Sequence, residues 1–235
     1  MSTFKERLTE LGGYWEYSGG RYLALLASGK ISDVFCNTGV LTTNPKECNK
    51  AARELAAILE PKVRAAQGSG PKASATTNIT WPISVIGPGM GGITLAYAIA
   101  SELSECPELG EVNAMFTEPV VEMSGVKGQK FRFELPENNL VVLIEDVITT
   151  GGSLQKTYQA VQPRRVLLHA ACLVDRRAEE GPVTLGDESK FEVGIVSLMR
   201  IKPTTWDTLE DAKKAHPNVV EAIKPKANWA KIVAG

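Results

Sequence analysis

The chain has 235 residues, 43% of them hydrophobic and 23% charged, and its 26 basic and 27 acidic side chains leave a formal net charge of −1. This composition excludes wholesale disorder and collagen-like repeats, and the length is sufficient for a sizeable buried core. The absence of a basic excess argues against a dedicated nucleic-acid-binding protein, so recognition of any anion must come from local geometry.

The sequence also bears on location and on metal binding. It contains no run of about 18 apolar residues, so we expect no membrane span. The first residues resemble no signal peptide, and we expect a cytoplasmic protein with free thiols. The four cysteines form no C-x-x-C pair and the chain has two histidines, which argues against a zinc site.

Two helices are predicted in the first third of the chain. Thr3 and Glu6 form a capping box that predicts a helix over about residues 4–11. The sequence Asn44-Pro45-x-Glu47 predicts the start of a second helix, which should end near Pro61. Small and polar residues over 67–80 predict an exposed loop.

Strands and helices alternate from Pro82 onward. Apolar runs predict strands over 83–87, 112–116, 140–144 and 166–174, and the intervening patterns predict helices over 93–103 and about 153–161. The continuous apolar runs are typical of strands buried on both faces. We therefore predict an α/β fold with a mainly parallel sheet flanked by helices.

The first strand-to-helix junction with unusual residues is Gly87-Pro88-Gly89-Met90-Gly91-Gly92. It fits the G-x-G-x-x-G pattern of dinucleotide-binding proteins, with Glu111 or Glu118 as the acidic partner. The alternative is that these glycines permit a tight turn and close packing of the helix on the sheet.

The second junction carries more chemistry. Glu145 and Asp146 follow the apolar run 140–144, and Thr149-Thr150-Gly151-Gly152-Ser153 comes directly after them. Adjacent carboxylates suit the paired hydroxyls of a ribose, because a carboxylate accepts hydrogen bonds. The following hydroxyls, backbone N–H groups and helix N-terminus suit one phosphate. A ribose bearing a 5′-phosphate matches this order of groups.

The segment from Val141 to Ser153 resembles the phosphoribosyl diphosphate (PRPP) signature of the type I phosphoribosyltransferases. The resemblance implies that Glu145 and Asp146 hold the ribose hydroxyls and that the loop holds the 5′-phosphate. The PRPP-binding residues would then be Glu145, Asp146, Val147, Ile148, Thr149, Thr150, Gly151, Gly152 and Ser153, with Gly89 and Met90 on the diphosphate side.

Further stretches resemble the orotate phosphoribosyltransferases of this family. Residues 26–39 resemble their N-terminal base-binding hood, and Val174-Asp175-Arg176 resembles their Asp-Arg pair. The resemblance implies that Lys30, Phe35 and Arg176 bind the base. It also implies a single domain over residues 1–235, with the hood at about 1–45, the core at about 80–200 and a C-terminal extension at 200–235.

The family's mobile catalytic loop carries cations, whereas residues 116–125 of this chain include Glu118 and Glu122. Lys127, Lys130 and Arg132 lie nearby and are the candidates to replace those cations. We therefore take Glu145, Asp146, Lys127 and Lys130 as the catalytic candidates.

The resemblance implies transfer from PRPP to a base, with orotate best matched, Mg²⁺ as the cofactor, no dedicated metal-ligating residues, and a homodimer. The alternatives are another base, or a regulator that binds PRPP without catalysis. Of the alternative functions, a nicotinamide-dependent oxidoreductase is the least favoured.

Overall fold

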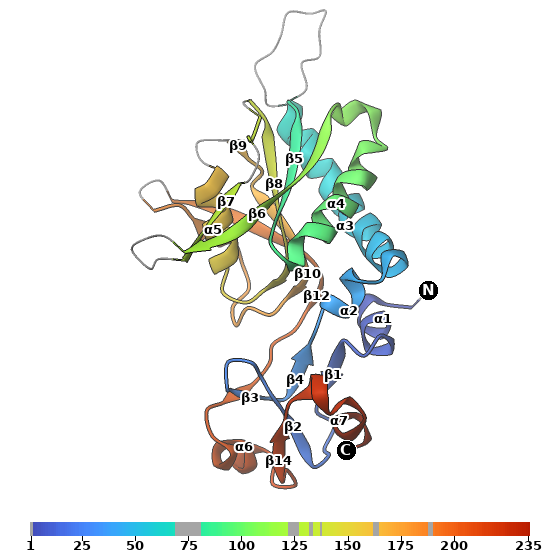
Figure 1. Ribbon diagram of the computed structural model, residues 1–235, viewed down its shortest axis with the longest axis vertical. Helices are drawn as coiled ribbons and strands as arrows, with labels where there is room; N and C mark the ends of the chain where they lie inside the picture. Colours follow the sequence, from blue (N-terminus) through green and yellow to red (C-terminus); the bar gives the residue numbers. More distant parts are fainter. Residues whose placement is uncertain are drawn as a thin grey trace, which may run out of the picture. The chain divides into compact units, whose positions relative to one another are not determined.

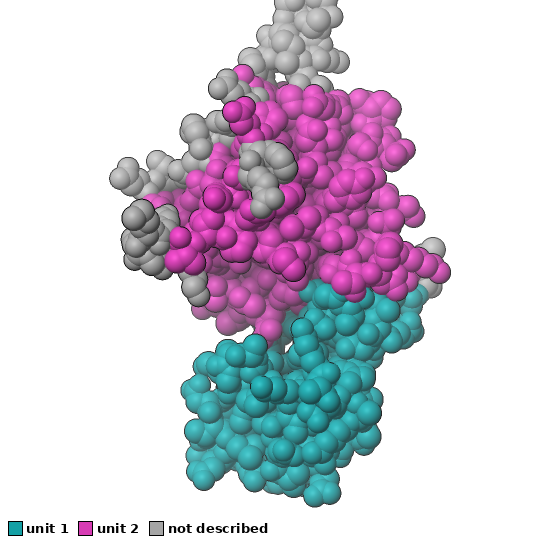
Figure 2. All heavy atoms as spheres, viewed as in Figure 1, with its two compact units in different colours: residues 1–41, 201–235 teal, residues 42–200 magenta. Residues whose placement is uncertain are grey.

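The computed structural model describes residues 2–68, 81–121, 127–131, 134–136, 138–161, 165–187 and 190–235. The chain forms two compact units, which Figure 2 distinguishes by colour. Residues 42–200 form one unit, and residues 1–41 together with 201–235 form the other. We call them the core unit and the hood unit.

In the described part of the core unit, eight strands form one sheet in the order β11-β12-β10-β8-β5-β6-β7, with β9 beside β8. The pairs among β5, β6, β8, β10 and β12 are parallel, and β7 and β11 are antiparallel edge strands. The predicted α/β class is therefore confirmed. The strands are β5 (Ile83–Pro88), β6 (Val112–Val121), β7 (Lys127–Phe131), β8 (Leu140–Ile148), β9 (Arg165–Val166), β10 (His169–Asp175), β11 (Val183–Leu185) and β12 (Phe191–Arg200).

Helices cover both faces of this sheet (Figure 1). Helix α4 (Gly91–Ser104) connects β5 to β6, and α5 (Gly152–Val161) follows β8 and precedes β9 and β10. These connections leave the centre of the sheet in opposite directions, so right-handed crossovers place the two helices on opposite faces. Helix α3 (Pro45–Gly68) packs against α4, β10 and β12. The strand order thus reverses between β5 and β8, where open α/β sheets bind their ligands.

The second predicted helix does not end near Pro61, and that prediction was wrong. Helix α3 continues to Gly68 with Pro61 inside it. The buried stripe of Leu55 and Leu59 continues at the same spacing with Val63, which is fully buried. Pro61 itself is exposed, so water can reach the backbone carbonyl that loses its intrahelical donor. Burial of the apolar stripe outweighs the local cost of the proline.

The predicted loop over residues 67–80 begins later than expected. Gln67 and Gly68 belong to α3. The Gln67 side-chain amide donates to the Trp81 carbonyl at 2.6 Å and accepts from the Trp81 N–H at 2.7 Å. Residues 69–80 lie outside the described part of the chain.

The predicted strand over 166–174 is divided into β9 and β10. Both segments pair with β8, but the pairing register shifts by two residues between them. Leu167 and Leu168 therefore form a bulge between the two strands. Leu167 is buried, whereas Leu168 is 58% exposed. An apolar run alone does not reveal this bulge, because both leucines fit a strand.

The hood unit is built from both ends of the sequence. Helix α1 (Phe4–Glu10) begins with the predicted capping box. The C-terminal strands pair with N-terminal ones in a sheet of order β13-β3-β2-β14. Two buried clusters combine residues from the two ends, for example Leu23 with Val219 and Ala24 with Ile223. The remaining elements of this unit are β1 (Tyr14–Glu16), β2 (Tyr22–Leu25), β3 (Ile31–Ser32), β4 (Val34–Cys36), α2 (Gly39–Thr42, at the boundary), β13 (Thr205–Trp206), α6 (Leu209–Ala215), β14 (Glu221–Ile223), the 3-10 helix η2 (Pro225–Ala227) and α7 (Trp229–Ala234).

Among the described helices, none has the length and apolar character needed to cross a membrane.

We predict that Gly87→Ala destabilises the core unit. A Cβ atom at Gly87 would overlap the backbone of Gly92, and overpacking of this kind costs about 1–3 kcal/mol. Gly68→Ala is the matched control, because nothing lies within 4 Å of a Cβ there. Urea unfolding should show a lower midpoint for Gly87→Ala and a midpoint close to that of the parent chain for Gly68→Ala. Equal midpoints for the two variants would contradict the close packing.

Candidate active site

The sequence-predicted groups of the core unit gather at the carboxyl ends of three neighbouring strands. Strand β5 leads into Gly89 and Met90, β8 carries Glu145 and Asp146 near its end, and Arg176 follows β10. The order β10-β8-β5 places these strand ends side by side. Because the three strands are parallel, their carboxyl ends share one edge of the sheet.

Glu145 is a buried carboxyl group without enough hydrogen-bond donors. Glu145 is 7% exposed, and its side-chain Oε2 atom has no hydrogen-bond partner among the described residues. Burial, and next the negative charge of Asp146, raise the pKa of Glu145 to about 8, although a hydrogen bond with Ser153 opposes the shift. A buried acceptor of this kind requires donors, and the hydroxyls of a ribose are donors of the right type.

Asp146 is held at the start of α4. Its Oδ1 atom accepts a hydrogen bond from the Val147 N–H at 2.9 Å. Its carboxylate packs so closely against Gly91 that a Cβ atom there would lie 2.5 Å from the Asp146 Cγ. Gly91 is therefore needed for the approach of the carboxylate, and the positive end of α4 favours the charge.

The loop after β8 encloses a small polar cavity of about 220 Å³. Gly151 has a φ of +83°, and its carbonyl accepts from the Gln155 N–H at 3.0 Å, which starts α5 directly behind the loop. The Gly152 N–H bonds to the Thr150 hydroxyl at 3.4 Å. The cavity is lined by Glu145, Val147, Ile148, Thr149, Thr150, Gly151, Gly152, Ser153, Leu154 and Lys156. Backbone N–H groups at a helix N-terminus, hydroxyls and a cation together suit a phosphate.

Sequence reasoning missed Lys156 in this cavity. Its position was nevertheless readable, because it lies four residues after Gly152, one turn along a predicted helix.

Gly89 and Met90 form a turn beside the carboxylates. The Gly89 N–H donates to the Thr117 carbonyl at 2.8 Å, and the Gly89–Met90 peptide bond is cis. Met90 is 86% exposed. The glycines at 87, 91 and 92 all permit close approach of neighbouring atoms, as expected if they serve close packing rather than dinucleotide binding.

Two consecutive arginines at the end of β10 have different roles. Arg177 binds the buried Asp175 carboxylate through two hydrogen bonds of 3.0 and 2.9 Å, and Arg200 adds a third at 2.7 Å. Burial disfavours the charge on Asp175, but these two arginines outweigh it and lower its pKa.

The backbone N–H of Arg176 donates to the Ile148 carbonyl at 2.9 Å. Its guanidinium makes no hydrogen bond or ion pair within the described residues. Sequence reasoning did not foresee the network at Asp175, which engages Arg177 and leaves the Arg176 guanidinium available at this edge.

The two hood residues proposed to contact a base lie in the other unit. Lys30 forms an ion pair with Asp207 at 3.2 Å, and both side chains are exposed. Phe35 is buried, and its ring centroid lies 6.2 Å from that of Trp229. Their roles in base binding stay predictions.

The stretch corresponding to the family's mobile loop is partly a β-hairpin. Strand β6 continues to Val121 and pairs with β7. Glu118 lies opposite Lys130, and Val121 opposite Lys127. Lys130 is exposed on this edge strand, which β5 and β6 separate from β8. Residues 122–126, including Glu122, and Arg132 lie outside the described part of the chain, as does the Lys127 side chain.

Comparison with known proteins agrees with this geometry. Residues 72–197, more than half of the chain, match the phosphoribosyl transferase domain family. The orotate phosphoribosyltransferase of Deinococcus radiodurans is 36% identical over 168 residues, which cover 70% of this chain and 74% of that protein. The orotate phosphoribosyltransferase of Thermoanaerobacter sp. is 28% identical over 187 residues, 79% of this chain and 80% of that protein.

Among solved structures, the crystal structure of orotate phosphoribosyltransferase from Aeropyrum pernix has the same fold. Its TM-score is 0.55 at 19% identity, over 91% of this chain and 97% of that one. The parallel sheet, the paired carboxylates and the polar loop have the arrangement expected of a transferase that handles a phosphorylated ribose. The chain belongs to the type I phosphoribosyltransferase family, and within it to the group similar to the orotate phosphoribosyltransferases.

We predict that Glu145 makes the free protein less stable as the pH rises from about 4.5 to about 8. The folded chain keeps the Glu145 proton up to about pH 8, whereas the unfolded chain releases it near 4.5. The unfolded state therefore binds fewer protons in this range, and the free energy of unfolding falls with pH. The total loss is a few kcal/mol, since one pKa unit corresponds to about 1.4 kcal/mol.

Urea unfolding of the metal-free protein at several pH values measures this effect. Glu145→Gln should remove the fall, whereas Glu192→Gln, which changes an exposed carboxyl group on β12, should keep it. The assignment is wrong if Glu145→Gln leaves the pH dependence unchanged.

Proposed function

We propose that this chain transfers the phosphoribosyl group of PRPP to orotate, giving orotidine 5′-monophosphate and diphosphate. One observation carries the proposal: a single strand–loop–helix unit presents the Glu145–Asp146 pair and, directly after it, the polar cavity of residues 149–153. The choice of orotate rests on the curated relatives, which carry that name.

The cavity would hold the 5′-phosphate, and the two carboxylates would accept hydrogen bonds from the ribose hydroxyls. Donors from the ribose would supply the partner that Glu145 Oε2 lacks in the described residues. The backbone at Gly89 and Met90 would contact the diphosphate. Because the phosphate, the ribose and the diphosphate are each held, PRPP would be fixed with its anomeric carbon facing the base.

Phosphoribosyltransferases generally use Mg²⁺. The described residues contain no group of three or more His, Cys, Asp or Glu side chains that could hold a metal ion. We propose that the oxygens of PRPP supply most of the coordination. Adjacent carboxylates suit such a shared site, because Mg²⁺ usually binds through one or two carboxylates plus substrate phosphates. Glu145 and Asp146 would hold the ion through the hydroxyls or through water, and it would neutralise charge on the diphosphate.

The reaction breaks the bond between the anomeric carbon and the diphosphate oxygen and forms a bond from that carbon to a ring nitrogen of the base. Positive charge develops on the ribose as the diphosphate leaves. Glu145 and Asp146 stabilise this charge from the hydroxyl side of the ring. The base nitrogen is the nucleophile, so the protein's main contribution is positioning and electrostatic stabilisation.

Arg176 would bind the base. A guanidinium can donate two parallel hydrogen bonds to a carboxylate or a carbonyl edge, and orotate presents both. The network of Arg177, Arg200 and Asp175 fixes the chain on either side of Arg176. From the family resemblance alone, we propose base-binding roles for Lys30 and Phe35 and a single phosphoribosyltransferase domain that includes the hood. From the family resemblance we also propose a homodimer located in the cytoplasm.

We expect turnover with PRPP, Mg²⁺ and orotate, measured as release of diphosphate, and weaker or no turnover with other bases. Asp146→Asn should lower kcat/KM about 100-fold, the effect of removing one electrostatic group from a transition state. Glu192→Gln should have no effect on activity. Undiminished activity of Asp146→Asn would contradict the ribose site. PRPP binding without turnover on any base would instead identify a regulator, the reading that the acidic Glu118 favours.

A further prediction concerns the residues of this chain that neutralise the leaving diphosphate in place of the family's loop cations. We propose that Lys127 and Lys130 neutralise it, although Lys130 lies across the strand pair from Glu118. Lys130→Ala should lower kcat on the order of tenfold or more with little change in the KM for orotate, because the charge acts on the transition state. Lys46→Ala, which removes an exposed lysine at the start of α3, is the control. An unchanged kcat for both Lys127→Ala and Lys130→Ala would exclude this role.

A further inference from the structure

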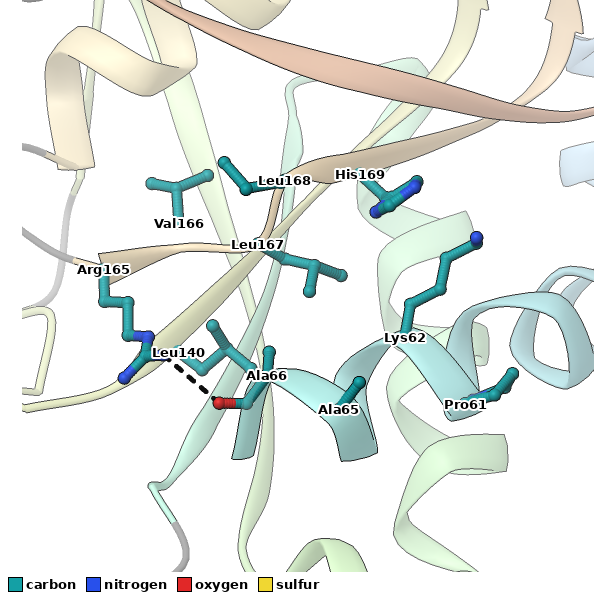
Figure 3. Close-up of a pocket in the computed structure, with 10 residues that line it drawn as sticks. All are labelled: Pro61, Lys62, Ala65, Ala66, Leu140, Arg165, Val166, Leu167, Leu168 and His169. Atoms are coloured by element: carbon teal, nitrogen blue, oxygen red, sulfur yellow. Dashed lines mark hydrogen bonds between the residues drawn. The ribbon is translucent and has the colours of Figure 1, made fainter. Parts of the chain in front are cut away.

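The core unit contains a second pocket, at the edge of the sheet opposite the carboxylates. It has a volume of about 590 Å³, within the usual range of small-molecule sites. It lies between the C-terminal half of α3 and the chain around β9 and the start of β10 (Figure 3). Its lining residues are Pro61, Lys62, Ala65, Ala66, Leu140, Arg165, Val166, Leu167, Leu168 and His169.

The wall of this pocket is apolar and its charged or titratable groups are all basic. Leu140 and Leu167 are buried and lie with Ala66 between Arg165 at one end and Lys62 and His169 at the other (Figure 3). No carboxylate lines the pocket among the residues that the structure describes. The bulge between β9 and β10 forms part of the wall, since Leu167 and Leu168 both line it.

Lys62 and His169 lie at the same end of the pocket (Figure 3). Burial, and next the charge of Lys62, lower the pKa of His169. Neither side chain has a hydrogen bond or an ion pair within the described residues. An ammonium disfavours the protonated form of a nearby imidazole, and an anion bound between the two groups would remove this penalty.

The other side chains hold this geometry in place. The His169 ring lies against Gly194 of β12, where a Cβ atom would come within 3.1 Å of His169 Cδ2. Arg165 donates to the Ala66 carbonyl at 3.2 Å and lies over the Trp81 ring at 5.7 Å. Arg165 therefore closes one end of the pocket, and the polar end that faces a ligand is formed by Lys62 and His169.

We propose that this pocket binds a small organic carboxylate with an apolar body. The two carboxylate oxygens would accept hydrogen bonds from the Lys62 ammonium and the His169 ring, and the apolar body would cover Leu140, Leu167 and Ala65. Two donors match the two oxygens of a carboxylate. The site is separate from the proposed PRPP site, because it lies at the amino ends of β8 and β10.

The chain's two histidines, His169 and His216, allow a site-specific test in the whole protein. His216 lies between Tyr17 and Trp206 in the hood unit and serves as an internal reference. Proton NMR of the imidazole signals would follow a titration with octanoate, which has a carboxylate and an apolar chain. We expect a saturable shift of the His169 signal with an unchanged His216 signal.

Acetate has the carboxylate without the long apolar chain, and 1-octanol has the apolar chain without the carboxylate. Each should bind at least tenfold more weakly than octanoate. Lys62→Gln should weaken octanoate binding about tenfold or more, as for loss of a hydrogen bond to a charged group, whereas Lys46→Gln should not. Ala65→Phe, which fills the pocket from an exposed position, should abolish the shift.

An absent shift of the His169 signal, an equal response to acetate, or unchanged octanoate binding by Lys62→Gln would overturn the proposal. Activity with PRPP is not part of this test, so its outcome is independent of the proposed function.

Discussion

The burial of Glu145 beside Asp146 is the constraint on which the core unit depends. Two adjacent carboxylates at the end of a strand buried on both faces cannot both be fully solvated, and Glu145 responds by keeping its proton to about pH 8. The charged form of Glu145 is favoured only when hydrogen-bond donors or positive charge lie close to it. Gly91, by lacking a side chain, lets the second carboxylate lie at the N-terminus of α4, where the helix dipole partly compensates it. The Oε2 atom of Glu145 is thus left without a partner among the described residues, and the proposed ribose would donate to it.

The topology of the sheet explains why the proposed phosphate site lies at the same strand end. Because α4 and α5 leave β5 and β8 on opposite faces, neither helix covers the gap between the two strand ends. Both helix N-termini point toward this gap, and each follows a glycine-rich turn. One turn carries Gly151 at a positive φ, and the other requires the contact of Gly87 with Gly92. The open gap, the two helix ends and the carboxylates therefore all result from one reversal of strand order.

Much of this could be predicted from the sequence, because the signals are local. The strand periods, the capping box and the order of acids and hydroxyls from Glu145 to Ser153 depend on neighbouring residues only. The departures come from distant packing. Helix α3 continues through Pro61 because Val63 is buried against other elements. Patterns of neighbouring residues in the sequence do not contain this information. The bulge at Leu167 arises from a register shift against β8, and an apolar run is equally compatible with either register. Likewise, the pairing of the C-terminal strands with the hood joins residues about 200 positions apart.

A net charge of −1 would suggest a poor binder of anions, yet what matters is which cations lack partners. Arg177 and Arg200 are committed to Asp175. Such pairs contribute to the charge count but offer little to a ligand, because their donors are already used. Several basic side chains have no hydrogen bond or ion pair within the described residues, and they include Arg176 and Lys156 at the carboxyl ends of the strands and Lys62 with His169 at the amino ends. Strand β8 connects these two edges, from Leu140 in the pocket to the carboxylates. Anion recognition by this chain is therefore a property of unpaired donors in particular places, which explains how a nearly neutral protein can bind a substrate as highly charged as PRPP.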